Sequence, residues 1–199
     1  MINDIFKIPF YKTSLNLDNE TLAKFCNDLV TKQKRIRNVS ILGGVQSGEI
    51  GEEDSNNNPA VFSLATSITK HSTFFAKEIG IVDELSIGSL WANIGGYKDS
   101  HRYHHHPHSM LGGVYYVSAP KDCGSIRFYH PYWETMQYDW NKNTVLENNA
   151  YTIGTMDMPV SSNTLYLFPN WLNHSVEPNL NKKEKRISIA FNMFISQVT

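Results

Sequence analysis

The sequence predicts a mainly β domain with flanking helices, in which an antiparallel β-sandwich or barrel follows a helical N-terminal layer. Two observations carry this prediction. After Leu85, short strand-like runs recur about every ten residues and are separated by Gly, Pro and Asn, as in sandwiches and barrels. Before Leu85, two longer segments carry apolar residues at helical spacing.

The N-terminal layer begins with residues 5–11, which we expect to form a short strand. Asp18 is a plausible N-cap, and the apolar spacing after it predicts an amphipathic helix over residues 19–34. A second apolar stripe predicts a helix over residues 61–79 that ends near Gly80. Between the two helices, residues 43–59 are dense in Gly and Asn, and we expect a mobile loop there.

The β region is expected to span about residues 85–195, after a helical layer of about residues 1–80, within one domain that covers residues 1–199. An insertion over residues 130–149 carries Trp133, Tyr138 and Trp140, and is either a lid or binding loop or a connector. The predicted strands are 85–94, 102–106, 111–118, 124–129, 150–154, 163–168, 173–177 and 186–195.

Composition limits the possible partners. The chain has 199 residues, 41% of them hydrophobic, which suits one core rather than two large domains. The formal net charge of −1 gives no basic field for nucleic acid and no polybasic anchor for lipid. Cys26 and Cys123 form no disulfide framework and fit a reducing cytoplasm, although a lone buried pair stays open. We expect no secretory signal and no membrane span.

A histidine cluster is the strongest functional signal. Residues 101–109 hold five of the eight histidines. If this segment is a strand, His104 and His106 share one face while His105 points away. His174, at the start of a later strand, can supply a third imidazole. This order resembles the facial triad of non-haem iron sites, with His106 where a carboxylate would be expected.

A strand-like run that begins with Arg186 follows the last histidine of this set. Alternation along residues 186–192 places Arg186, Ser188, Ala190 and Asn192 on one face. A guanidinium and a hydroxyl on that face can hold a carboxylate. Arg186 could also be an ordinary surface cation after Lys-Lys-Glu-Lys, but its place after three correctly ordered histidines favours function.

Other titratable residues near the cluster are weaker candidates. We interpret His105 and His130 as packing or surface residues, whereas His101 and His108 remain open as substitutes for His104 or His106. Asp99 and Glu177 are poor carboxylate ligands, because Asp99 lies outside the strand and Glu177 faces away from His174.

At these residues the chain resembles the 2-oxoglutarate- and Fe(II)-dependent oxygenase superfamily, and within it the small oxygenases common in phages and marine bacteria. Gly112 departs from the pattern, which has Ser there, and the superfamily's carboxylate ligand is absent. The matching residues are Trp91, Asn93, His104, His106, Pro107, Ser109, Leu111, Gly113, Val114, Tyr115, Tyr116, Phe168, Pro169, Trp171, Leu172, His174, Val176, Pro178 and residues 186–192.

The resemblance implies a double-stranded β-helix, which is a jelly-roll or cupin-like barrel whose mouth holds iron. It implies that His104, His106 and His174 bind Fe(II). It also implies that the distal carboxylate of 2-oxoglutarate pairs with Arg186, helped by Ser188 and Tyr116. The expected activity is hydroxylation of an unidentified substrate with release of succinate and CO2.

Two other functions remain open at the sequence level. One is a three-histidine cupin-type dioxygenase that uses no 2-oxoglutarate, and the other is a non-catalytic jelly-roll binding module. The substrate is expected to be a small molecule or a peptide, and nucleic acid is disfavoured. A homodimer is open, and the expected location is the cytoplasm, or the host cytoplasm if a phage encodes the chain.

Overall fold

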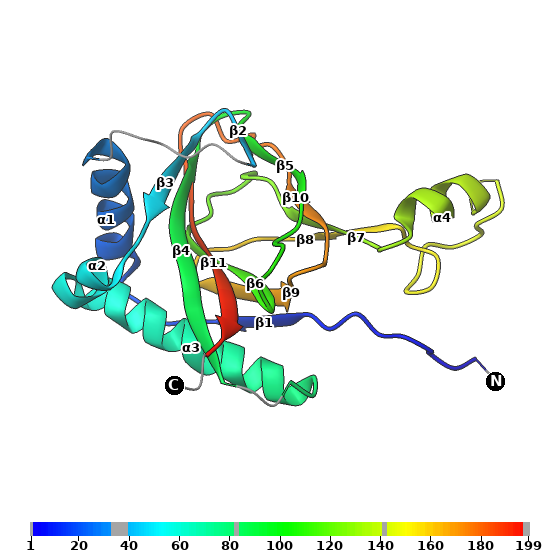
Figure 1. Ribbon diagram of the computed structural model, residues 1–199. Helices are drawn as coiled ribbons and strands as arrows, with labels where there is room; N and C mark the ends of the chain where they lie inside the picture. Colours follow the sequence, from blue (N-terminus) through cyan, green and yellow to red (C-terminus); the bar gives the residue numbers. More distant parts are fainter. Residues whose placement is uncertain (1, 33–39, 82–83, 141–142, 197–199) are drawn as a thin grey trace.

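The computed structural model describes residues 2–32, 40–81, 84–140 and 143–196, and places two antiparallel β-sheets face to face (Figure 1). In spatial order, the six-stranded sheet consists of β1 (Tyr11–Ser14), β9 (Thr164–Pro169), β6 (Leu111–Ser118), β11 (Arg186–Ile195), β4 (Leu85–Gly95) and β3 (Val45–Glu49). The five-stranded sheet consists of β2 (Ile41–Leu42), β5 (Ser100–His104), β10 (His174–Val176), β7 (Ile126–Tyr129) and β8 (Thr155–Met158).

Two helices, α1 (Asn19–Lys32) and α3 (Pro59–Glu78), pack on the outer face of the six-stranded sheet, and α2 (Glu52–Asn57) packs against α3 (Figure 1). A fourth helix, α4 (Trp133–Asp139), lies beyond β7 and β8 (Figure 1). The expectation of a mainly β fold with an N-terminal helical layer is confirmed. None of the helices in the described residues is long and apolar enough to cross a lipid bilayer.

The six-stranded sheet is buried on both faces, and side-chain alternation divides its residues between two environments. Along β11, Ile187, Ile189 and Phe191 pack against the helices in the larger core. The alternate residues Arg186 and Ser188 face the five-stranded sheet and line a pocket. The helical layer thus stabilises the sheet from one side, which leaves the other side free to carry polar groups.

The helix limits follow from local capping. Asp18 Oδ1 accepts a hydrogen bond from the Thr21 amide at 3.0 Å, which confirms the predicted N-cap of α1. Asn58 Oδ1 caps α3 by accepting from the Ala60 amide at 3.0 Å, with Pro59 at the first helical position. Gly80 follows α3 with a positive φ of 85°. The predicted end of the first helix at residue 34 lies outside the described residues.

The predicted loop over residues 43–59 is wrong, because this segment forms β3, α2 and the start of α3. Polar residues at buried positions concealed the strand. Gln46 and Ser47 are both buried, and the Ser47 hydroxyl accepts a hydrogen bond from the Ala92 amide of β4 at 2.9 Å. Some of the Gly and Asn residues that suggested a loop are helix caps, since Gly51 is the N-cap of α2 and Asn58 is the N-cap of α3.

Three strand predictions were misplaced along the chain. The opening strand begins at Tyr11 rather than residue 5, because its partner β9 provides pairing only for Tyr11–Ser14. The strand expected at 150–154 is instead β8, which begins at Thr155 because β7 provides pairing only for Thr155–Met158. The strand expected at 102–106 is β5, which begins at Ser100 and ends at His104. The insertion over residues 130–149 contains α4 instead of being a loop throughout.

Gly113 of β6 lies where the packing leaves no room for a side chain. A Cβ at this position would lie 2.2 Å from Phe191 Cζ and 2.8 Å from the Tyr166 carbonyl oxygen. We expect Gly113→Ala to lower the free energy of unfolding by about 1–3 kcal/mol, because the neighbouring ring and backbone must move.

The matched control is Gly154→Ala, whose Cβ would make an ordinary contact with Trp133 at 3.7 Å. Its effect should stay within about 0.5 kcal/mol. Urea denaturation followed by circular dichroism measures both variants, and equal stability of the two would contradict the packing described for β6.

Candidate metal and co-substrate site

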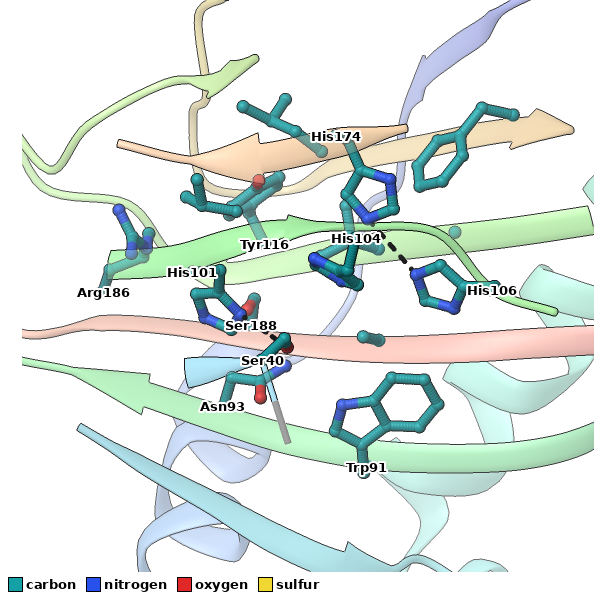
Figure 2. Close-up of a pocket in the computed structure, with 16 residues that line it drawn as sticks. Ser40, Trp91, Asn93, His101, His104, His106, Tyr116, His174, Arg186 and Ser188 are labelled. Atoms are coloured by element: carbon teal, nitrogen blue, oxygen red, sulfur yellow. Dashed lines mark hydrogen bonds between the residues drawn. The ribbon is translucent and has the colours of Figure 1, made fainter. Parts of the chain in front are cut away.

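Three imidazoles from two separate parts of the chain converge inside the barrel (Figure 2). His104 ends β5 and His174 begins β10, and the two residues are direct partners in the antiparallel register. His106 follows two residues after the end of β5. The His174 ring centroid lies 4.3 Å from that of His104 and 5.0 Å from that of His106. One potential ligand atom from each residue lies within 4.8 Å of the others, so the three could hold a single metal ion.

The prediction that strand alternation places His106 on the same face as His104 is wrong, since β5 ends at His104. Instead, the His106 amide donates to the Asn170 carbonyl at 3.0 Å, and its ring Nδ1 lies 2.5 Å from Asn192 Oδ1. Asn192 lies on β11, on the face predicted from alternation. His106 is therefore positioned by a turn and by contact with the opposite sheet.

Backbone and amide oxygens set the orientation of all three rings. Besides the contact of His106 with Asn192, His104 Nδ1 lies 2.6 Å from the Arg102 carbonyl, and His174 Nδ1 lies 3.0 Å from the Leu172 carbonyl. A carbonyl oxygen only accepts, so each Nδ1 donates its hydrogen and each Nε2 keeps its lone pair.

The lone pairs then face one another, since the Nε2 atoms of His106 and His174 are only 3.2 Å apart. Two lone pairs at this distance repel unless a cation lies between them. Oxygen acceptors on the outer nitrogen are also the usual support for metal-binding histidines.

The three imidazoles are held in the neutral form that binds metal. Burial lowers the pKa of His106 to about 4, and the neighbouring His104 acts in the same direction. Burial also places the pKa of His174 well below its ordinary value and lowers that of His104.

No carboxylate joins this group among the described residues. The Asp99 carboxylate accepts a hydrogen bond from the Gly96 amide at 2.7 Å, and Glu177 forms an ion pair with Arg127 at 3.1 Å. The structure also leaves His101 outside the group. A divalent metal held by three neutral nitrogens would keep its full positive charge, and an anionic co-ligand would offset that charge.

A second polar group lies in the same pocket, around Arg186 and to one side of the three imidazoles (Figure 2). Arg186 is only 3% exposed. Its Nη1 donates to the carbonyl oxygens of Cys123 and Glu177, whereas its buried Nη2 has no hydrogen-bond partner among the described residues. The buried hydroxyl of Tyr116 likewise has no partner in the described part of the chain, and Ser188 lines the same pocket.

These unpaired donors indicate that the pocket is built for an anion. Arg186 forms no ion pair with a carboxylate of the described residues. Burying a charged group without a partner is costly, and a bound carboxylate would supply the acceptors that the protein lacks. Burial lowers the pKa of Arg186, but a guanidinium remains protonated in proteins.

Three further residues line the pocket: Trp91 and Asn93, which the sequence offered only as part of the family resemblance, and His101, which it left open as a substitute metal ligand. Trp91 stacks beside His106 with ring centroids 6.0 Å apart. Asn93 on β4 is the register partner of Ser188 on β11, and its buried Oδ1 has no hydrogen-bond partner among the described residues. His101 points into the pocket from β5. Alternation along β4 could have placed Trp91 and Asn93 on one face, but only strand pairing shows that this face meets the histidines.

The fold and the pocket together are those of a non-haem metal enzyme. The model of the family described as "Putative 2OG-Fe(II) oxygenase" matches residues 89–192, which is more than half of the chain. The chain belongs to this family of 2-oxoglutarate- and Fe(II)-dependent oxygenases. No curated protein matches the chain in sequence.

Solved structures with similar folds are distant in sequence. A prolyl-4-hydroxylase from Pseudomonas putida is 13% identical with a TM-score of 0.66, and the match covers 95% of this chain and 94% of that one. The α-ketoglutarate-dependent epimerase SnoN of nogalamycin biosynthesis is 14% identical with a TM-score of 0.65, covering 94% and 79%. HygX from Streptomyces hygroscopicus, solved with nickel and 2-oxoglutarate, is 14% identical with a TM-score of 0.56, covering 96% and 85%. These matches confirm the double-stranded β-helix.

The described residues fit the two cofactors that this family uses. Neutral imidazoles with converging lone pairs suit Fe(II), and the unpaired donors of Arg186 and Tyr116 suit a carboxylate of 2-oxoglutarate.

His174 provides the most direct test of the three-imidazole site. We expect His174→Ala to abolish stoichiometric Fe(II) binding, because it removes the residue that faces both other rings. Anaerobic equilibrium dialysis measures the loss. His105→Ala is the control, since His105 is exposed beside the site and should keep wild-type affinity. Full iron affinity in His174→Ala would show that the metal binds elsewhere.

Proposed function

We propose that His104, His106 and His174 hold Fe(II) and that Arg186, with Tyr116 and Ser188, holds the distal carboxylate of 2-oxoglutarate. With O2 as the oxidant, the enzyme then hydroxylates a substrate not yet identified and converts 2-oxoglutarate to succinate and CO2. The observation that carries these roles is one pocket containing both the three converging imidazoles and the unpaired donors of Arg186 and Tyr116.

When bound, iron and 2-oxoglutarate supply the oxidative chemistry, and the protein supplies binding, orientation and exclusion of water. Arg186 is fixed by the carbonyls of Cys123 and Glu177, so its free Nη2 is pre-oriented. Tyr116 projects from the adjacent strand β6, and burial raises the pKa of its phenol, which keeps it a donor. Apolar neighbours reduce solvent screening of the guanidinium; they are Val114, Ile126, Phe168 and Val176.

A three-histidine dioxygenase without 2-oxoglutarate is the second candidate, favoured by the lack of a carboxylate in the ligand group. It leaves the unpaired donors of Arg186 and Tyr116 without a role. Succinate formation separates the two: it should require both Fe(II) and 2-oxoglutarate, and it should proceed slowly even without primary substrate. Oxygen consumption with no succinate would favour the second candidate.

The compartment and partners are proposed on composition. Two free, buried cysteines support a reducing cytoplasm, that of a bacterium or of a phage-infected host. A net charge of −1 supports a small-molecule or peptide substrate over nucleic acid.

Replacing Arg186 tests the co-substrate role. Arg186→Ala should weaken 2-oxoglutarate binding by about 2–5 kcal/mol, or roughly thirtyfold or more, because the carboxylate would lose its charged partner. Arg186→Lys should also weaken binding, since a point charge replaces a bidentate fork. Calorimetric titration of Zn(II)-loaded protein with 2-oxoglutarate measures both variants.

Arg127→Ala is the matched control, because Arg127 pairs with Asp157 and Glu177 on the outside of the barrel. It should keep wild-type affinity for 2-oxoglutarate. Metal binding should survive in all of these variants, since none removes an imidazole. Unchanged affinity in Arg186→Ala would exclude the proposed carboxylate site.

A further inference from the structure

His101 is a fourth imidazole in the pocket, and it is not part of the metal-ligand group. It lies three residues before His104 on β5, where it pairs with Val176 of β10 and Ile41 of β2. Its ring lies between the three converging imidazoles and Arg186 (Figure 2). The metal site therefore does not explain why an imidazole occupies this position.

The hydrogen bonding of His101 leaves one ring nitrogen available to a ligand. Nδ1 lies 3.4 Å from the Ser40 hydroxyl, and Nε2 forms no hydrogen bond with a described residue. Burial and the positive charge of Arg186 lower the pKa of His101 to about 3, so the ring is neutral and carries one N–H. If Ser40 donates to Nδ1, the hydrogen resides on Nε2.

The position of His101 complements the other donors. Arg186 and Ser188 project from β11, and Tyr116 projects from β6, so all three belong to the six-stranded sheet. Among the described lining residues of the five-stranded sheet, the metal ligands aside, Ile126 and Val176 are apolar and His101 alone is polar. A ligand held by Arg186 would thus meet one donor from the opposite sheet.

We propose that His101 is a second anchor for the co-substrate, donating a hydrogen bond from its ring to bound 2-oxoglutarate. This inference rests on the proposed function. Bound 2-oxoglutarate then accepts hydrogen bonds from both sheets, from Arg186 on the six-stranded sheet and from His101 on the five-stranded sheet. Ser40 acts as a positioning residue, because its hydroxyl selects the tautomer that presents the donor.

The test compares variants that remove or keep the donor. His101→Leu should weaken 2-oxoglutarate binding to the Zn(II)-loaded protein by roughly ten- to a hundredfold, the usual effect of losing a hydrogen bond to a charged group. His101→Gln keeps an N–H and should retain most of the affinity. His105→Leu is the control, because that exposed neighbour should leave binding unchanged. Should His101→Leu fail to fold, His101→Met carries the same comparison.

Zn(II) affinity and thermal stability are measured on the same samples and should not change in His101→Gln. Wild-type 2-oxoglutarate affinity in His101→Leu, with weakened binding in Arg186→Ala, would overturn this inference alone. Loss of Zn(II) affinity in His101→Leu would overturn it in favour of a metal-ligand role. Failure of the wild-type protein to bind 2-oxoglutarate would overturn the proposed function as well.

Discussion

The alternation of side chains along β11 is the constraint on which the pocket depends. β11 pairs with β4 on one side and β6 on the other, so it lies in the middle of the six-stranded sheet. Its apolar residues belong to the larger core beneath the helical layer, and their burial stabilises the sheet from the face opposite the pocket. Arg186 and Ser188 can therefore remain polar, and Asn192 can orient His106. A shift of one residue in register would exchange the two faces.

The electrostatics of the pocket follow from the lack of a carboxylate paired with the imidazoles or with Arg186 among the described residues. Its metal-binding atoms are neutral nitrogens, its guanidinium is buried, and no described carboxylate pairs with either group. Such a pocket is positive before any ligand binds and more so with a divalent metal. A dianion that reached both the metal and Arg186 would offset this charge and would give the unpaired donors of Arg186 and Tyr116 an acceptor.

The sequence predicted the long central strands well, since β6 and β11 have the expected limits and carry strong apolar patterns. The short strands β2 and β3 were missed, because their limits depend on partners far along the chain. The three histidines and Arg186 were identified by residue type and order. Their convergence rests on the pairing of His174 with His104 and on the turn that carries His106, and neither can be derived from local pattern. The same is true of His101, whose position between the two groups emerges only from the folded chain.

We propose that one pocket holds Fe(II) and 2-oxoglutarate in contact with each other. Anaerobic addition of 2-oxoglutarate to the Fe(II)-loaded protein, followed by visible absorption, tests this most directly. We expect a metal-to-ligand charge-transfer band that saturates at stoichiometric 2-oxoglutarate and is absent when either component is omitted. Stoichiometric iron binding without such a band at any 2-oxoglutarate concentration would contradict it.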